Sequence, residues 1–519
     1  MRMQDMTPRR RWAIGAAALA AGLLVGPAAT SAGTSEPGAG GGELRVGMGD
    51  ALVVPDPHTA GSQTDHQILG NIYEGLTRRN VETGAIEPAL AESWEANADY
   101  TQFTFRLRPG VTFHDGSPLA ASDVAWSIDR IVNPDTKATF SSDLAFVEST
   151  EVIDDTTVVI NLSQPFALLP TILADNTFAA IVPESNGANL MTTPIGTGPF
   201  QWEAMVPQTS VTLTRFADYW DPPTGPAIDG VTFLAIPDAN AKIQALLSNQ
   251  VDMVDTVPSS QVATLEGTPN IRVELFESAW TDYFAMQTQS GPFADPLVRR
   301  AVTMAINKPE LTELATFGLG QALDTMIVPA SPLQLDITPL PFDVDAARAL
   351  LAEAGYADGF AFTFSACGGT AFPEMLTAGQ VIAANLAEIG VDATFETTDS
   401  GVFANEIFVQ HDFDAYVCGL SAFLDPDART YRYFYTDGSY NAPGYSNPAV
   451  DVALDAARTT GDLAERTEMY ETAWQLITED APWVILFTFP NSLAMSERVQ
   501  GYVLDPNAFL PLNDVYLTE

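Results

Sequence analysis

The clearest pattern of hydrophobic and polar positions lies between residues 68 and 132. Residues 68–76 carry apolar side chains at helical spacing and end near Gly75, which predicts a short helix. Residues 103–107 alternate between apolar and polar side chains, which predicts a strand with one buried face. Ser122 is predicted to cap a further helix, whose apolar face is formed by Val124, Ser127, Ile128 and Ile131. The block therefore predicts a compact α/β unit.

A second pattern, between residues 360 and 418, predicts three strands joined by two helical segments. The strands are expected at residues 360–367, 391–397 and 413–418, and the helical segments at 373–389 and 402–409. A βαβαβ order of this kind predicts parallel strands with right-handed crossovers. Ligands of such sheets bind outside the carboxyl ends of the strands. We therefore expect a ligand near Cys367, near Asp399 and near the segment that follows Cys418.

The two cysteines of the chain, Cys367 and Cys418, both end predicted strands, and each is followed by glycine. If the two strands are neighbours, the Cα atoms can lie within the ~4.4–6.8 Å that a disulfide requires. An oxidising compartment favours such a bond. The intervening crossovers could instead hold the strands apart, and free buried cysteines are common. The sequence leaves both states open.

Several short words occur in order along the first block, at residues 73–76, 88–94, 105–111, 113–116 and 122–124. They read YEGL, PALAESW, FRLRPGV, FHDG and SDV, and looser matches such as GTGPF at 196–200 and GYSNP at 444–448 continue toward the C-terminus. In these words the chain resembles the family 5 solute-binding proteins of ABC importers, the dipeptide, oligopeptide and nickel type. The words are mainly structural, so the resemblance identifies a family and not a ligand.

The resemblance implies an α/β fold with two lobes around a hinged ligand cleft and an extra subdomain. This is the type II-like, cluster C kind of periplasmic binding protein. We expect the core of lobe I at residues 43–76, 199–283 and 491–519, its subdomain at 77–198 and lobe II at 284–490. Because the chain would cross between the lobes at least twice, closure is expected to be a hinge motion.

Residues 1–32 are expected to form a cleaved signal peptide. Arg2 and three arginines at 9–11 precede an apolar run at 13–25, which is shorter than the ~20 residues of a membrane span. A retained membrane anchor is the alternative, and the paired arginines before Trp12 leave the twin-arginine export route open. No cysteine follows the apolar run before Cys367, which argues against a lipoprotein. We therefore expect a periplasmic protein.

Composition and motifs narrow the function. The chain has 66 acidic and 23 basic residues, a formal charge of −43, which disfavours nucleic acids and anionic membranes as partners. The charge serves solubility or steers a cationic ligand. No nucleophile elbow, His-Glu-x-x-His pair or Walker loop occurs, and the four histidines are too scattered for a metal site. We expect no enzyme activity, metal or cofactor; a secreted hydrolase or chaperone-like protein is the alternative.

The resemblance implies a monomer that captures a peptide or similar polar solute and delivers it to the permease and ATPase subunits of an ABC importer. The expected ligand-binding residues lie in the loop before residue 68, in the segment that crosses between the lobes and at the strand ends. They are Gln63, Asp65, Trp280, Tyr283, Cys367, Asp399, Cys418, Ser421, Ala422, Phe423 and Asp425.

Peptide-binding members of the family usually carry a Gly-Trp-x-x-Asp-x-x-Asp-Pro word after the third strand, and its first Asp binds the α-ammonium of the peptide. Here Ala422 stands at that Asp position and Leu420 at the Trp position, in a segment one residue shorter. The usual ammonium anchor is therefore expected to be absent. Two kinds of ligand remain compatible with the sequence. One is a peptide held by Asp399, Asp425 or Asp427. The other is a modified peptide, an oligosaccharide, or an opine-like or other polar solute stacked on aromatic side chains.

Overall fold

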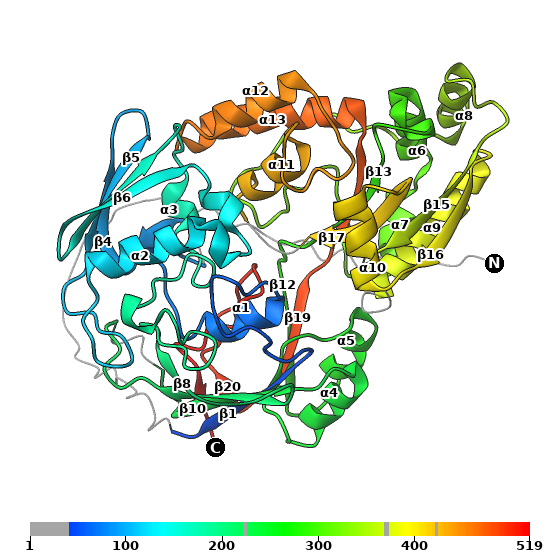
Figure 1. Cartoon of the computed structure of the whole chain (residues 1–519). Coiled ribbons are helices and arrows are strands. Elements are labelled where there is room, and N and C mark those ends of the chain that lie inside the picture. Colours follow the sequence, from blue (N-terminus) through cyan, green and yellow to red (C-terminus); the bar gives the residue numbers. More distant parts are fainter. Residues whose placement is uncertain (1–40, 82, 222–225, 368–372, 421–423) are drawn as a thin grey trace, which may run out of the picture. The chain divides into compact units, whose positions relative to one another are not determined.

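The computed structural model describes residues 41–519, except residues 82, 222–225, 368–372 and 421–423. Within this part, three larger sheets of seven, six and four strands carry the fold (Figure 1). Two short ribbons accompany them, β2 (Thr77–Arg79) with β3 (Ile86–Pro88) and β20 (Val499–Gln500) with β21 (Tyr516–Leu517).

The seven-stranded sheet is built from both ends of the described chain and from residues near its middle. Its order is β12 (Ile271–Phe276), β19 (Asn491–Ser496), β11 (Met253–Val254), β1 (Glu43–Met48), β10 (Gly230–Ala235), β9 (Ser210–Arg215) and β8 (Phe200–Val206). Strand β1 runs parallel to β10 and β11, and the other pairs are antiparallel. Leu44 and Val46 of β1 are fully buried in one core with Phe233 of β10.

The six-stranded sheet confirms the βαβαβ prediction. Its order is β14 (Gln321–Ala322), β18 (Trp483–Thr488), β13 (Thr281–Met286), β17 (Ala415–Leu420), β15 (Ala361–Ala366) and β16 (Asp392–Thr397). Strand β15 is parallel to both β16 and β17. Helix α9 (Pro373–Glu388) connects β15 to β16, and α10 (Ser400–Ala404) with a following π-helical turn connects β16 to β17.

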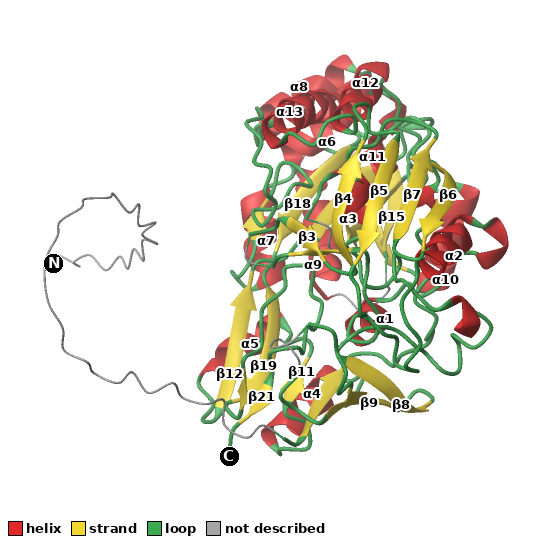
Figure 2. Cartoon of the chain, turned by 90° about the vertical axis from the view of Figure 1, so that its left-hand side faces the viewer, coloured by secondary structure: helices red, strands yellow, loops and turns green. Residues whose placement is uncertain are grey.

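The four-stranded sheet is antiparallel and contains the block with the strongest sequence pattern. Its order is β4 (Ala91–Ala96), β5 (Gln102–Leu107), β7 (Thr157–Leu162) and β6 (Val147–Asp154), with α2 (Ala121–Val132) beside it (Figure 2). Phe103 and Phe105 are buried in one core with Val124 and Ile128, as predicted. The prediction that Ser122 caps this helix is wrong. The N-cap residue is Ala120, and its backbone N–H donates to the carboxylate of Asp123 (3.0 Å).

The helix predicted at residues 68–76 is wrong in position. Helix α1 spans Gln63–Leu69, so it begins in the stretch before residue 68 that the sequence predicted as a loop and overlaps the predicted helix only at residues 68 and 69. A capping box sets its start, because Ser62 Oγ accepts the backbone N–H of Asp65 (3.0 Å). Gly75 does not end a helix; a Cβ there would lie 2.2 Å from the carbonyl oxygen of Leu173. Close backbone approach explains this glycine.

Two short links join the two larger sheets. Strand β12 ends at residue 276 and β13 begins at 281, while β18 ends at 488 and β19 begins at 491. The four strands pair across these links, β12 with β19 in one sheet and β13 with β18 in the other (Figure 1). The chain therefore passes from one sheet to the other through two adjacent antiparallel connections.

The remaining α-helices are α3 (Leu169–Ile172), α4 (Ala239–Leu247), α5 (Ser259–Glu266), α6 (Pro296–Ala305), α7 (Lys308–Thr316), α8 (Val344–Glu353), α11 (Asp427–Phe434), α12 (Pro448–Ala457) and α13 (Leu463–Asp480). Helices α11, α12 and α13 contribute to a core with β13, β17 and β18, in which Phe434 contacts Trp474 and Trp483. In the described part of the chain, the search for a helix long and apolar enough to cross a membrane finds none.

Candidate ligand-binding site

A cavity of about 470 Å³ is lined by segments that are far apart in the sequence. They come from α1 and the turn after it, from the β2–β3 ribbon, from residues 166–178, from residues 424–427 and from residues 503–514. These segments belong to all three predicted units. The volume lies within the ~300–1,000 Å³ that is usual for small-molecule sites.

Two acidic residues of the cavity wall are already neutralised by arginine. Asp425 accepts two hydrogen bonds from Arg466 (2.9 and 2.7 Å), and Asp427 accepts two from Arg458 (2.8 and 2.9 Å). Burial alone would raise the pKa of the Asp425 carboxyl, but the charge and hydrogen bonds of Arg466 hold that pKa below its ordinary value. Both pairs are bidentate. One links Asp427 of α11 to Arg458 at the end of α12, and the other links Asp425, just before α11, to Arg466 of α13.

A third acid of the same wall, Asp505, has no such partner. Its side chain accepts the backbone N–H of Asn507 (2.8 Å) and forms no ion pair within the described chain, although the residue is only 7% exposed. Burial raises the pKa of Asp505 to about 6, since the charged form loses its hydration. The charge of Asp175 acts in the same direction, and that of Arg79 opposes it.

Further polar groups face the cavity beside Asp505. Asn507 is 9% exposed, and its Oδ1 atom has no hydrogen-bond partner in the part of the chain that the structure describes. The buried Nε2 atom of His66 likewise has none there. Asp175 uses one carboxylate oxygen, Oδ1, for the N–H groups of Thr177 (2.8 Å) and Phe178 (3.0 Å).

Arg79 supplies positive charge to the cavity from strand β2. Its Nη1 atom donates to the carbonyl of Gly84 (3.0 Å), and no ion pair to it occurs among the described residues. Burial lowers the pKa of Arg79, while the charges of Asp425, Asp505 and Asp175 act against that shift. The neighbouring Arg78 differs, because it is paired with Asp221 (2.6 Å).

The C-terminal wall of the cavity is fixed from behind. Gln63 and Gln67 of α1 donate side-chain hydrogen bonds to the carbonyl of Ala508 (3.0 and 2.9 Å). The carbonyl of Pro506, between Asp505 and Asn507, accepts the N–H of Ala279 (3.1 Å) and the side-chain amide of Asn491 (3.1 Å). Ala279 lies on one link between the larger sheets, and Asn491 is the first residue of β19 after the other link.

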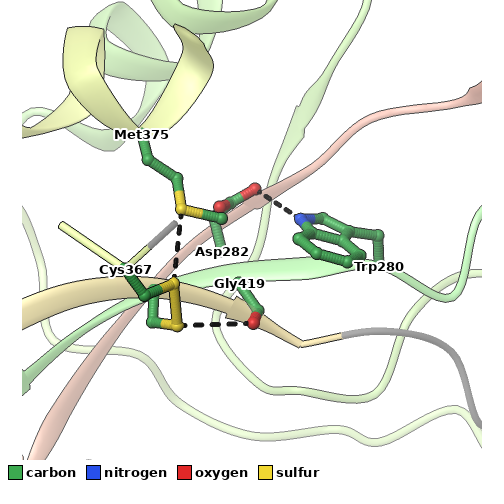
Figure 3. The surroundings of a disulfide bond; sticks show 6 residues. Trp280, Asp282, Cys367, Met375 and Gly419 are labelled. Carbon is green, nitrogen blue, oxygen red and sulfur yellow. Dashed lines mark hydrogen bonds between the residues drawn. A yellow bond between two sulfur atoms is a disulfide. The ribbon is translucent and has the colours of Figure 1, made fainter. Parts of the chain in front are cut away.

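The carboxyl ends of β15 and β17 form a second polar region, shown in Figure 3. Cys367 and Cys418 are joined by a disulfide with a Cα–Cα distance of 5.1 Å, which decides between the two states that the sequence left open. Beside it, the indole N–H of Trp280 donates to Asp282 (3.0 Å) (Figure 3). Asp282 is fully buried, and burial holds its pKa well above the ordinary value, with the charge of Glu374 adding to the effect.

Of the residues predicted to bind ligand, Asp425 lines the cavity and Gln63 supports its wall. Asp65 serves the start of α1 and accepts the N–H of Val53 (3.1 Å). Trp280, Cys367 and Cys418 lie together at the disulfide (Figure 3).

Tyr283 is fully buried and stacks on Trp483 with ring centroids 3.8 Å apart. Asp399 caps α10 through the N–H of Gly401 (2.9 Å). The structure does not bring Tyr283 or Asp399 to the cavity. Ser421, Ala422 and Phe423 lie outside the described residues. A ligand role for all of these residues stays a prediction.

The sequence analysis did not identify most cavity residues, among them four on which the ligand-binding argument depends: Arg79, Asp175, Asp505 and Asn507. The adjacent arginines at 78 and 79 were a usable signal, because basic residues are scarce in this acidic chain. Asp505 and Asn507 stand in an irregular segment without periodicity. Among 66 acidic residues, Asp505 carries no local mark that distinguishes it.

Comparison with known proteins places the fold. The family model for bacterial extracellular solute-binding proteins, family 5, matches residues 85–441. The glutathione-binding protein GsiB of Pectobacterium atrosepticum is 28% identical over 529 residues, which span the whole of both chains.

Two solved structures are similar over 92% of this chain and 99% of theirs. The binding protein AgaA of A. tumefaciens R10, in complex with agropinic acid, is 26% identical with a TM-score of 0.80. DppA of Helicobacter pylori, in complex with the peptide STSA, gives the same two values. The fold is thus that of two-domain periplasmic binding proteins. The chain belongs to the family 5 extracellular solute-binding proteins, which are substrate-binding components of ABC importers and not enzymes.

Proposed function

We propose that the cavity holds the transported solute, and that this solute is a small peptide-like molecule whose carboxylate binds Arg79. The observation that carries the proposal is that the Arg79 guanidinium is largely buried and has no carboxylate paired with it among the described residues. Its only hydrogen-bond acceptor in this part of the chain is the Gly84 carbonyl. A buried charge of this kind is costly unless it is paired. A carboxylate of the solute would supply a bidentate partner.

Size and relatives support a small solute. A cavity of about 470 Å³ suits a molecule of a few amino-acid residues better than a long extended chain. The names of similar proteins mention glutathione, a four-residue peptide and agropinic acid. The non-peptide alternative, an opine-like or other polar solute, is favoured by the complexes of similar proteins with agropinic acid and mannopinic acid.

The wider transport role follows from the family. A family 5 protein binds a small molecule or peptide and works with an ABC permease and ATPase. We propose in addition that the chain acts as a monomer and is exported by a cleaved signal peptide at residues 1–32. The apolar run after the paired arginines supports export, and the twin-arginine route is a candidate.

We also propose that the two larger sheets mark two lobes that close on the solute. The seven-stranded sheet takes its strands from residues 43–48, 200–276 and 491–496, and the six-stranded sheet from 281–488. The four-stranded sheet, at 91–162, would be the subdomain of the first lobe. Two adjacent links between the larger sheets are what a hinge needs.

The experiment measures binding of a pool of di- to pentapeptides by calorimetry, with free and with amidated C-termini. The Arg79→Gln variant should lose roughly 10- to 100-fold in affinity for free peptides and little for amidated ones, because hydrogen bonds to charged groups contribute ~1.5–3 kcal/mol. Arg215→Gln is the matched control, since Arg215 pairs with exposed Asp229 outside the cavity. Equal affinity of wild type and Arg79→Gln for free peptides would contradict the proposal.

Mass spectrometry of the solute that co-purifies with the wild-type protein separates the peptide from the non-peptide alternative. A saturating native solute should also raise the free energy of unfolding, by about 2.7 kcal/mol at a hundredfold excess over Kd. A co-purified oligosaccharide without any anionic group would rule out the peptide-like solute.

A further inference from the structure

We propose that Asp505 and Asn507, with Asp175 beside them, bind the cationic group of the solute, which in a peptide-like molecule is the α-ammonium. The inference rests on the proposed function only in placing the solute in the same cavity. It assigns the ammonium to the C-terminal segment of the chain, and not to the segment after β17 where the family's usual anchor position holds Ala422.

The first observation is an acceptor without a donor. The Oδ1 atom of Asn507 is buried, and it has no hydrogen-bond partner among the residues that the structure describes. Buried polar atoms are almost always paired in native proteins, so an unpaired one at a cavity wall marks the place of a missing donor. The donor required here must reach the atom from the cavity that Asn507 lines.

The second observation is an acid without a cation. Asp425 and Asp427 line the same cavity, and each has a bidentate arginine. Asp505 is buried to a similar degree, yet among the described residues its carboxylate accepts hydrogen bonds only from Asn507 and forms no ion pair, and Arg79 acts on it only as a nearby charge. Because a buried carboxylate is costly without a cation, a positively charged group of the solute would complete this wall as Arg466 completes the other.

The chemistry of the three acceptors fits an ammonium. A primary ammonium has three N–H donors and no acceptor. The wall offers the Asp505 carboxylate, the Asn507 Oδ1 atom and the Oδ2 atom of Asp175, whose other oxygen is occupied by the N–H groups of Thr177 and Phe178. Arg79 stands on the same cavity with the opposite charge, so the wall as a whole is complementary to a zwitterion.

The seat is held rigidly before any solute binds. The backbone between its two main residues is fixed because the carbonyl of Pro506 accepts two hydrogen bonds. The carbonyl of Ala508, two residues further on, accepts two more from α1. Groups fixed in this way lose little conformational entropy on binding, which favours affinity.

The test compares three forms of one peptide pool by calorimetry near neutral pH: free, N-acetylated and C-amidated. Wild-type protein should bind the N-acetylated pool roughly 10- to 100-fold more weakly than the free pool. Asp505→Asn should lose a similar factor for free and amidated peptides, but little for acetylated ones, which have no ammonium to lose. Asp218→Asn, an exposed carboxylate outside the cavity, matches the change in charge.

The outcomes separate the two proposals. If the wild type binds acetylated and free peptides equally, the ammonium seat is wrong while the role of Arg79 stands. If Asp505→Asn and Asp218→Asn lose affinity equally, the effect is the general field of the acidic chain and the seat is wrong. If free, acetylated and amidated peptides all fail to bind the wild type, both proposals are overturned. Unchanged circular dichroism of Asp505→Asn would exclude misfolding as the cause of a loss.

Discussion

Asp425 and Asp505 line one cavity, but their surroundings differ. Asp425 is neutralised by the two hydrogen bonds of Arg466, which hold its pKa below the ordinary value. In the described chain Asp505 accepts hydrogen bonds only from Asn507 and has no ion pair, and burial raises its pKa to about 6. The comparison separates an acid that completes the fold from an acid that still lacks a partner. Burial alone does not mark a binding residue; a buried acid without a paired cation becomes a candidate when it also lines the cavity.

Glu74 is an informative third case. It is buried and accepts hydrogen bonds from Thr197 (2.8 Å), Tyr219 (2.9 Å) and Trp220 (2.7 Å). Burial nevertheless raises its pKa to about 7, and the three hydrogen bonds only reduce that shift. Neutral donors satisfy the geometry of a carboxylate without replacing a cation. Glu74 has no ion pair among the described residues, but it does not line the cavity. We therefore expect no cationic group of the solute to pair with it.

The largest expected effect comes from removing the partner of the paired acid. Arg466→Met should lower the free energy of unfolding by about 3–5 kcal/mol, because it leaves the Asp425 carboxylate buried and uncompensated. Urea titration near neutral pH measures the change. In the double variant Asp425→Leu/Arg466→Met the loss should largely disappear, since a buried pair exchanged for apolar side chains is often neutral. A single variant as stable as wild type would erase the distinction between the two acids.

Glu74→Gln should change the pH dependence of stability. The folded state binds the Glu74 proton more tightly than the unfolded state, so this stabilisation is complete below pH 4.5 and is lost as pH rises through about 7. The decline amounts to at most about 3 kcal/mol. Gln cannot ionise, so the variant should lack this part of the slope. Parallel stability curves for wild type and Glu74→Gln would count against the raised pKa.

Asp505→Asn should have a similar but smaller effect in ligand-free protein. The raised pKa stabilises the folded state below pH 3.8, and that contribution is lost as pH rises through about 6. The free energy of unfolding of the Asn variant, relative to that of wild type, should therefore rise by up to about 2–3 kcal/mol as the pH is raised from below 3.8 to above 6. Thermal unfolding at several pH values measures the difference. A variant that loses stability at all pH values would show that the carboxylate has a structural partner after all.

The smallest effect is on affinity. The groups that face Asp505 in this region are Arg79, Asp175, His66 and Tyr502. Because the carboxylate must be ionised to bind an ammonium, affinity for free peptides should rise about tenfold from pH ~5 to pH ~7. N-acetylated peptides should show a flatter profile. Equal pH profiles for both peptide forms would argue against the seat.

Sequence reasoning succeeded where local spacing determines structure. The alternation at Phe103 and Phe105 identified a strand, and the order of strands and helices after residue 360 identified parallel strands. The sequence left the disulfide open, because it did not show that β15 and β17 are neighbours. It misplaced α1, because the capping box of Ser62 and Asp65 stands in a polar stretch that looked like a loop. It missed Arg79 and Asp505, because only the folded chain brings residues so distant in sequence to one cavity.

The carbonyl of Pro506 connects the proposed ammonium site to the links between the two larger sheets. One oxygen atom connects the segment of Asp505 and Asn507 to both links between the larger sheets, through Ala279 and Asn491. If the two links act as the proposed hinge, a solute that displaces this segment would act on both links through these two hydrogen bonds. Solute binding and closure would then be coupled through this one carbonyl. The residence time of the solute would depend on Ala279 and Asn491, which do not line the cavity.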